Sequence, residues 1–243
     1  MKIYFAGGVY PYSEVIHKYN GKVLLSFADQ KSINNYLSKY PNKKIFLDSG
    51  AFTASTMGKE INIDDLISFI KRNIKNLEVY ATLDVIGNWK ATKENTKYME
   101  KRGLKPLPVF HYKSPKEELI DLVKNYDYFG LGGLVPIAKD KKIMRSWLDM
   151  CFSIIQDKAK THGFGVTALW ALKRYPFYST DSTSYLQASR YGSSKIIKNE
   201  KIIKFNNKTK HYLQRTDIEV EATIKMRNYI TNLWKARGID YEN

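Results

Sequence analysis

The chain has 243 residues, 43% of them hydrophobic, so it is long enough to form one large hydrophobic core. Its 40 lysines and arginines against 24 aspartates and glutamates leave a formal net charge of +16, which favours a polyanionic partner such as nucleic acid. The single cysteine, the absence of an apolar run near 18 residues and the absence of a signal-like N-terminus argue against disulfide scaffolds, membrane-spanning proteins and secreted precursors.

We therefore expect a cytoplasmic protein with no membrane association. The four histidines are dispersed and no cysteine cluster accompanies them, so the sequence predicts no metal site and no cofactor. The positive charge has a plainer explanation as well, because a lysine-rich surface can reflect the general composition of the host's proteins.

Short apolar segments alternate with helical segments along most of the chain, which is typical of parallel βα units. Strands are predicted at Ile3–Ala6, Val23–Ala28, Lys44–Asp48, Val79–Asp84, Leu107–His111, Tyr128–Gly132, Gly163–Thr167 and Phe177–Thr180. Helices, with apolar residues three and four apart, are predicted at Ile63–Ile74, Thr92–Arg102, Pro115–Lys124 and Lys142–Lys160. This alternation indicates an α/β fold, a (β/α)8 TIM-like barrel of one domain spanning residues 1–243. An open doubly wound sheet is the alternative, although the Gly-x-Gly-x-x-Gly fingerprint is absent.

The pattern changes after the last predicted strand. The basic, β-prone segment KIIKNEKIIKF at 195–205 predicts a hairpin or a long loop within a basic insertion at about 190–215. A final helix is predicted at about 216–237, capped by Thr216 or Asp217 and ended by Gly238. We expect this helix to close the barrel.

Polar residues at the carboxyl ends of barrel strands are candidate functional residues, because these ends converge on one face in TIM barrels. Asp48, Asp84 and Asp181 are predicted at such ends. A buried carboxylate cluster is costly unless hydrogen bonds, protonation or a ligand compensates it, so the three together indicate a site. Each aspartate taken alone has a second interpretation as a helix N-cap.

Three further strand-end features have two interpretations each. The glycines of FGLGGLVP at 129–136 allow a flat ligand or an anion to approach the backbone, or simply form a tight turn. His111 lines the predicted pocket and orients a phosphate or an aspartate, or it makes a structural hydrogen bond. Phe52, considered alone, is predicted to be a core residue, although an aromatic ring at this position can also stack on a base.

The motif LDSGAF at 47–52 resembles the Asp-Ser-Gly-Gly-Phe motif of the queuine and archaeosine tRNA-guanine transglycosylases. The resemblance extends over roughly residues 45–205 and implies a (β/α)8 barrel that exchanges guanine in a nucleic acid for a modified base. The later residues that keep the family's order are Asp84, Gly132 to Leu134, Gly165, Val166 and Asp181.

The resemblance implies a role for each matching residue. Asp181 would attack C1′ of a nucleotide and form a covalent glycosyl-enzyme intermediate, and Asp48 would act as general acid and base. The base would leave the nucleic-acid stack to enter the pocket. The implied base-binding residues are Asp84 for the purine N1 and amino group, Gly133 and Leu134 for the base carbonyl, and Phe52 for stacking. Ser49, Gly132 and, as a separate prediction, His111 are further candidate substrate-binding residues.

Several departures from the family pattern point to its DNA-modifying branch. The cysteine-rich zinc site of the tRNA enzymes is missing, and the chain is shorter with no appended RNA-binding module. Ala51 replaces the second glycine of the motif, and Thr53 stands where the bacterial enzymes have glutamine. These features resemble the phage and defence-island enzymes that insert 7-deazaguanine derivatives into DNA. We therefore expect DNA as the partner and a 7-deazapurine base as the small-molecule substrate.

Other functions stay open at this point. The same chemistry directed at tRNA is the first alternative, and a non-catalytic nucleic-acid-binding barrel is the second. A metal-dependent hydrolase is a weaker alternative, because its usual paired strand-end histidines are absent.

A basic segment follows the predicted nucleophile, where the transglycosylases contact nucleic acid. Its positive side chains are expected to bind phosphates, although a solvated charged hairpin has the same composition. The predicted phosphate-binding residues are Arg190, Lys195, Lys198, Lys201, Lys204, Lys208, Lys210 and Arg215.

Overall fold

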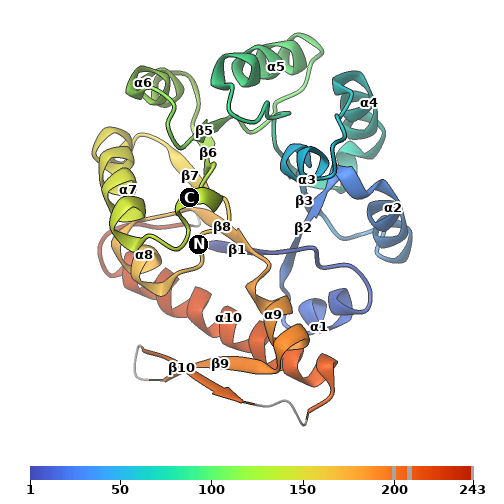
Figure 1. Ribbon diagram of the computed structural model, residues 1–243, viewed down its shortest axis with the longest axis vertical. Coiled ribbons are helices and arrows are strands. Elements are labelled where there is room, and N and C mark those ends of the chain that lie inside the picture. Colours follow the sequence, from blue (N-terminus) through green and yellow to red (C-terminus); the bar gives the residue numbers. More distant parts are fainter. Residues whose placement is uncertain (199–200, 207–209, 242–243) are drawn as a thin grey trace. The chain divides into compact units, whose positions relative to one another are not determined.

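The computed structural model describes residues 1–198, 201–206 and 210–241, with the backbone alone at 187–189, 193–198, 201–202 and 204 (Figure 1). The strands of its main sheet are β1 (Lys2–Ala6), β2 (Lys22–Ser26), β3 (Ile45–Asp48), β4 (Leu77–Tyr80), β5 (Val109–His111), β6 (Tyr128–Gly132), β7 (Lys160–Gly163) and β8 (Ser179–Ser182). The helices are α1 (Tyr12–Lys18), α2 (Gln30–Lys39), α3 (Ala51–Thr56), α4 (Ile63–Asn73), α5 (Trp89–Lys101), α6 (Lys116–Asn125), α7 (Lys141–Ile155), α8 (Leu169–Arg174), α9 (Ser184–Tyr191) and α10 (Tyr212–Lys235). Short 3-10 helices lie at Phe27–Asp29, Ile74–Asn76 and Val135–Ile137.

The eight strands form one parallel sheet, so the predicted α/β class is confirmed. Hydrogen-bonded neighbours follow the order β4-β3-β2-β1-β8-β7-β6-β5. A parallel bridge between Ala81 and Leu107 joins the chain just after β4 to the chain just before β5. This strand order, with helices between successive strands, is consistent with a TIM-like (β/α)8 fold.

The chain divides into two compact units. Unit 1 consists of Met1–Val23 and His162–Asn243, and unit 2 of Leu24–Thr161. The boundaries lie within β2 and β7. Unit 1 therefore contains β1, β8 and the C-terminal helix, whereas unit 2 contains β3 to β6 and the helices α2 to α7.

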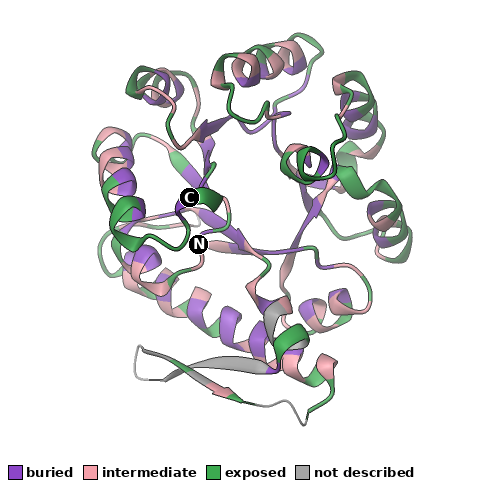
Figure 2. Cartoon of the chain, in the orientation of Figure 1, coloured by how far each residue is buried: buried purple, intermediate pink, exposed green. Residues whose placement is uncertain are grey.

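In unit 2, amphipathic helices and apolar strands form the core. Helix α4 begins at the N-cap Asn62, whose side-chain oxygen accepts hydrogen bonds from the backbone of Asp64 and Asp65. It buries Leu66, Ile67, Phe69 and Ile70. Figure 2 shows the same division in α7, with one buried and one exposed side. Cys151 lies on the buried side and is inaccessible to solvent, as the sequence predicts for a core position.

In unit 1, the long helix α10 contacts α9, α1, α8 and β1. The indole N–H of Trp234 in α10 donates a hydrogen bond to the carbonyl of Leu172 at 2.8 Å. Asp217 forms an ion pair with Lys18 at 2.8 Å. The predicted caps are wrong, because the helix starts four residues before Thr216. His211 is the N-cap, and it forms a capping box with Gln214.

A two-stranded antiparallel sheet precedes α10. It consists of β9 (Ser193–Lys198) and β10 (Lys201–Asn206). The register places Lys195 opposite Lys204 and Lys198 opposite Lys201. Four positive residues are therefore concentrated on a short hairpin.

Three of the predicted strands are misplaced at or near candidate site residues. Strand β4 ends at Tyr80, so Asp84 lies in the loop after it rather than at its last position. Strands β7 and β8 lie at 160–163 and 179–182 instead of 163–167 and 177–180. Thr161 and His162 in β7 and Ser179 and Thr180 in β8 are polar and yet buried, so hydrophobicity did not reveal these strands. Among the described residues, no helix is both long and apolar enough to span a bilayer.

Candidate active site

Asp181 lies within β8 of unit 1 and is almost completely buried, with 8% of its surface exposed. Its Oδ1 accepts a hydrogen bond from the backbone N–H of Gly165 at 3.0 Å and lies 3.2 Å from Nε2 of His162. Within the described part of the chain, its Oδ2 has no hydrogen-bond partner. One oxygen of this carboxylate is therefore held in place, whereas the other is left for a ligand or water.

His162 is a site residue that the sequence analysis missed, because the strand that carries it was placed too late in the chain. It is fully buried in β7, and its Nδ1 lies 2.6 Å from the hydroxyl of Ser179. The rings of Phe164 and Tyr4 lie against it, with centroids 4.4 and 6.0 Å from the centroid of the imidazole. Ser179 and Asp181 are two residues apart in β8, so they share one face of the strand.

This Asp-His-Ser array does not have the arrangement of a serine nucleophile. Ser179 is completely buried, so its hydroxyl is out of reach of a substrate. Gly165, by contrast, is exposed, and Asp181 retains some exposed surface. The accessible end of the array is therefore the carboxylate of Asp181.

Asp84 lies in unit 2, in the loop between β4 and α5. Its Oδ2 lies 3.1 Å from Nε2 of His111, and the two side chains are only 19% and 22% exposed. Its Oδ1 is buried and makes no hydrogen bond to any described residue. An unpaired buried carboxylate oxygen is costly, and a ligand that donates an N–H there would remove the cost. Helix α5 is capped by Asn88, so the N-cap interpretation of Asp84 is wrong.

The Asp84 charge determines the protonation behaviour of His111. Burial alone would lower the pKa of this imidazole, but the charge and the hydrogen bond of Asp84 outweigh burial and raise the pKa above its ordinary value of 6.5. A pKa raised in the folded state adds stability that is fully present below the unfolded pKa and is lost as the pH rises through the folded pKa.

We therefore expect Asp84→Asn to destabilise the protein most in acid. The amide retains the shape of the carboxylate but removes the charge that raises the pKa of His111, so burial then opposes protonation. Thermal unfolding between pH 5 and pH 9 should show the gap in melting temperature to wild type widest below about pH 6.5 and shrinking above it. The surface variant Asp140→Asn is the control, because asparagine caps α7 as well as aspartate does. A gap that is independent of pH would contradict the assigned cause.

Gly133 leaves room for the His111 ring. Its φ is +70°, and a Cβ atom built on it would lie 3.2 Å from the backbone nitrogen of Tyr112 and 3.4 Å from Cβ of His111. Gly132 pairs with His111 across β5 and β6, and its carbonyl accepts the N–H of Tyr112 at 3.0 Å. Gly133 is exposed whereas Leu134 is buried, so the turn presents backbone rather than side chain.

The DSGAF segment of unit 2 forms a tight turn between β3 and α3. Oδ2 of Asp48 accepts the N–H of Gly50 at 2.9 Å, and Gly50 itself is the N-cap of α3, so the interpretation of Asp48 as an N-cap is wrong. Ser49 is buried. Phe52 is 52% exposed, so its prediction as a core residue is wrong and its ring is accessible for stacking.

The predicted catalytic and base-binding residues therefore fall into two groups. Asp181 belongs to unit 1, together with Gly165 and with His162 and Ser179, which were not predicted. The other group belongs to unit 2 and follows four successive strands in the chain, β3 to β6. Its members are Asp48, Ser49, Phe52, Asp84, His111, Gly132, Gly133 and Leu134. In this unit the carbonyl of Leu47 accepts the N–H of Ala81 at 2.9 Å, so the ends of β3 and β4 are adjacent.

The predicted phosphate-binding residues lie on α9, the hairpin and the start of α10. Arg190 and Lys210 are exposed, and Nη1 of Arg215 donates to the carbonyl of Lys210. Lys195 and Lys198 belong to β9, and Lys201 and Lys204 to β10. Lys208 lies outside the described residues.

The exposed cations of this segment give a prediction about salt dependence. If Arg190 and Lys210 each neutralise a phosphate of duplex DNA, the double variant Arg190→Ala/Lys210→Ala should reduce the slope of log affinity against log salt by about 1.8, roughly 0.9 for each phosphate that is no longer neutralised. Fluorescence anisotropy with labelled DNA from about 50 to about 300 mM salt measures this slope. Lys71→Ala/Arg72→Ala, which removes two exposed cations from α4, is the matched control. An equal change in both double variants would mean that the effect is one of net charge alone.

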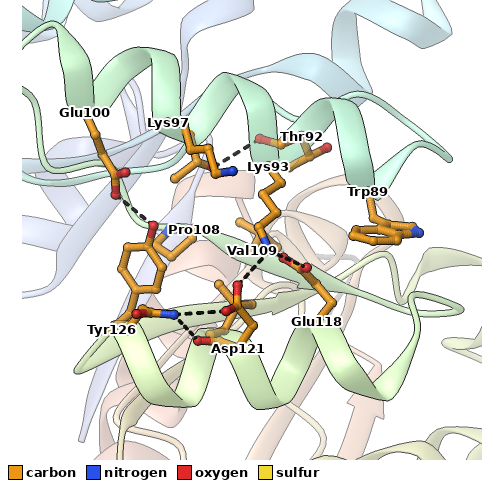
Figure 3. A pocket seen from close by; sticks show the side chains of 13 residues that line it. Trp89, Thr92, Lys93, Lys97, Glu100, Pro108, Val109, Glu118, Asp121 and Tyr126 are labelled. Carbon is orange, nitrogen blue, oxygen red and sulfur yellow. Dashed lines mark hydrogen bonds and ion pairs between the residues drawn. The ribbon is translucent and has the colours of Figure 1, made fainter.

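A cavity of about 500 Å³ lies elsewhere in unit 2, over α5 and α6 (Figure 3). The ammonium of Lys93 projects between Glu118 and Asp121, at 3.1 and 2.6 Å. Tyr126 donates a hydrogen bond to Glu100 at the other end of the cavity. Lys93 thus pairs with two of the carboxylates, and none of the predicted site residues lines the cavity. We assign it no role in function.

Within the described part of the chain, no group of three or more histidine, cysteine, aspartate or glutamate side chains is arranged to hold a metal ion. No protein-family model matches the chain, and no curated protein matches its sequence.

Proposed function

We propose that the protein is a transglycosylase that replaces guanine in DNA by a 7-deazaguanine derivative. The observation that carries the proposal is the environment of Asp181, whose carboxylate is buried, has Oδ1 fixed by two N–H donors and keeps Oδ2 available. A carboxylate held in this way is suited to nucleophilic attack on a sugar carbon, as in retaining glycosidases.

The reaction has two displacements. In the first, Oδ2 of Asp181 forms a bond to C1′, the bond from C1′ to the base nitrogen breaks, and its electron pair leaves with the base. Asp48 supplies the proton to the departing base. In the second, the nitrogen of the incoming base attacks C1′, Asp181 leaves as a carboxylate, and Asp48 takes up the proton that the incoming base loses.

The environment of Asp84 supports the recognition of a guanine-like base. Guanine and 7-deazaguanine present an N1–H and an amino group side by side, and the unpaired Oδ1 of Asp84 can accept one of them. His111 lies 3.1 Å from Oδ2, so this pair fixes the orientation of the carboxylate. The exposed backbone at Gly133 would donate to the base carbonyl, and the exposed ring of Phe52 would stack on the heterocycle.

The net charge of +16 and the basic hairpin support a nucleic acid as the polymer substrate. We propose DNA rather than tRNA because the chain lacks the cysteine-rich zinc region that the tRNA enzymes carry. The base enters the site only if it leaves the stack, so single-stranded DNA or a distorted duplex should react faster than a stable duplex.

The test is base incorporation measured in parallel on duplex DNA, single-stranded DNA and tRNA. Each polymer is incubated with the protein and isotope-labelled guanine, and with labelled 7-deazaguanine bases that differ in the substituent at position 7. Label in DNA that is lost in the Asp181→Asn variant supports the proposal. Label in tRNA alone would show that tRNA, and not DNA, is the substrate. Salt-sensitive binding without label in any polymer would favour a non-catalytic nucleic-acid-binding protein.

A further inference from the structure

The fully buried imidazole of His162 has a specific arrangement that the proposed base exchange does not yet use. Nε2 lies 3.2 Å from Oδ1 of Asp181, and Nδ1 lies 2.6 Å from the hydroxyl of Ser179. Burying an imidazole without partners is costly, so its two hydrogen bonds fix the orientation of the ring. Phe164 and Tyr4 pack edge-on against the ring and restrict its rotation.

We propose that His162 is a positioning residue for the nucleophile Asp181, and that Ser179 sets the tautomer in which His162 acts. A carboxylate oxygen only accepts hydrogen bonds, so Nε2 carries the hydrogen that points to Asp181. In the neutral ring Nδ1 is then an acceptor, and the Ser179 hydroxyl donates to it. This inference rests on the proposed function, because it assigns a role in glycosyl transfer.

The hydrogen bond acts differently in the two displacements. During attack, Nε2–H and the N–H of Gly165 hold Oδ1, so the carboxylate meets C1′ through Oδ2 in a single orientation. Once the Oδ2–C1′ bond has formed, Oδ1 is the carbonyl oxygen of the glycosyl ester. When that bond breaks, its electron pair returns to the carboxylate, and the negative charge spreads to Oδ1, where two N–H donors are already in place.

The test compares a variant that lacks the donor with one that retains it. His162→Leu removes the N–H and leaves an apolar side chain, whereas the side-chain amide of His162→Gln can still donate to Oδ1. We expect kcat to fall by roughly 100-fold in His162→Leu, as for the loss of one preorganised donor, and by roughly tenfold in His162→Gln. KM for DNA should stay within about twofold, because His162 is completely buried and does not touch the polymer. His17→Gln, the same substitution in α1 and outside both site groups, is the control with unchanged activity.

Two further measurements separate this role from a purely structural one. Rapid-quench assays should show both formation and breakdown of the covalent intermediate slowed in His162→Leu, at an unchanged fraction of folded protein. If His162→Leu does not fold, Ser179→Ala serves in its place, since it retains the ring but releases its tautomer, and kcat should fall by several-fold at constant KM. Nitrogen-15 NMR of the histidines in wild type should show the hydrogen on Nε2 of His162.

The outcomes distinguish the two proposals. Wild-type protein without base exchange on any polymer would refute the proposed function itself. Active wild type together with an active, folded His162→Leu variant would refute the positioning role alone. A loss confined to KM, or equal losses in the Leu and Gln variants, would also overturn it, since neither follows from removal of a hydrogen-bond donor.

Discussion

Asp181→Asn is expected to abolish base exchange and leave the protein folded. Asparagine has the size of aspartate, and its carbonyl oxygen can accept the same N–H from Gly165 and from His162. An amide is not a nucleophile towards C1′, however, so no glycosyl ester forms. We expect the rate to fall by roughly 10⁴-fold or more, as when a covalent nucleophile is removed from other enzymes.

The loss should be visible in two independent assays. Incorporation of labelled base gives the rate, and denaturing electrophoresis of labelled DNA shows the covalent adduct when the incoming base is withheld. The adduct should be absent from Asp181→Asn and present in Asp140→Asn, the same chemical change at the N-cap of α7. Melting temperatures should be similar in wild type and both variants. A normal rate in Asp181→Asn, with or without reduced stability, would leave Asp181 a structural role only.

Asp48 and Gly133 could be placed at strand ends from sequence, because each ends or follows a strand that is recognisable from its composition. Strand β6 occupies the predicted residues, and β3 differs from its prediction by one residue, since apolar or β-branched residues dominate both. The order of Asp48, Asp84 and Asp181 along the chain can be read from the sequence without knowledge of side-chain geometry. The Asp84–His111 pair did need it, because 27 positions separate the two residues and the parallel bridge between Ala81 and Leu107 is what brings their segments together.

His162 illustrates what the sequence could not predict. Strand β7 reads KTHG and strand β8 reads STDS, so neither has an apolar pattern. Hydrogen bonds from His162 to Ser179 and Asp181 compensate part of the cost of burying these strands, whereas the hydroxyls of Thr161 and Thr180 have no partner among the described residues. A hydrophobicity pattern records transfer from water and contains no information about such partners. Polar strands of a parallel sheet are therefore where a functional residue is most easily overlooked.

The N-terminus of α10 was misplaced for a different reason. Histidine is an uncommon N-cap, whereas threonine and aspartate are common ones, so residues 216 and 217 seemed the better start. The structure uses the ring nitrogen of His211 and the amide of Gln214 in a reciprocal cap instead. The sequence shows only which residue types are common N-caps, and the backbone geometry decides which residue caps the helix.

The glycine of the DSGAF segment gives the largest expected effect on stability. Gly50 has φ +78°, and a Cβ atom on it would lie 2.6 Å from the backbone nitrogen of Ala28 and 2.7 Å from the hydroxyl of Ser26. Gly50→Ala thus combines a left-handed backbone with a clash against main chain. We expect a loss of about 2–5 kcal/mol in the free energy of unfolding and a fall of roughly 5–15 °C in melting temperature.

Gly58→Ala separates the two causes. Gly58 has φ +64°, but no atom lies within 4 Å of the position a Cβ would occupy, so only backbone strain is added there. This control should lose about 1 kcal/mol, and the difference between the variants measures the crowding at Gly50. Equal losses in both, determined by thermal and urea unfolding, would show that the β3 to α3 turn relaxes around the new methyl group.

Ala51 is tolerated where the transglycosylase motif has a second glycine, because its backbone differs from that of Gly50. Ala51 is the first residue of α3, where the backbone is helical and any L-residue fits. Gly50, by contrast, donates its N–H to Asp48, so a shift of this turn also moves the proposed general acid. We therefore expect whatever folded Gly50→Ala protein remains to exchange base more slowly per molecule, whereas Gly58→Ala should retain the wild-type rate. A wild-type rate per folded molecule in Gly50→Ala would show that base exchange does not depend on how this turn positions Asp48.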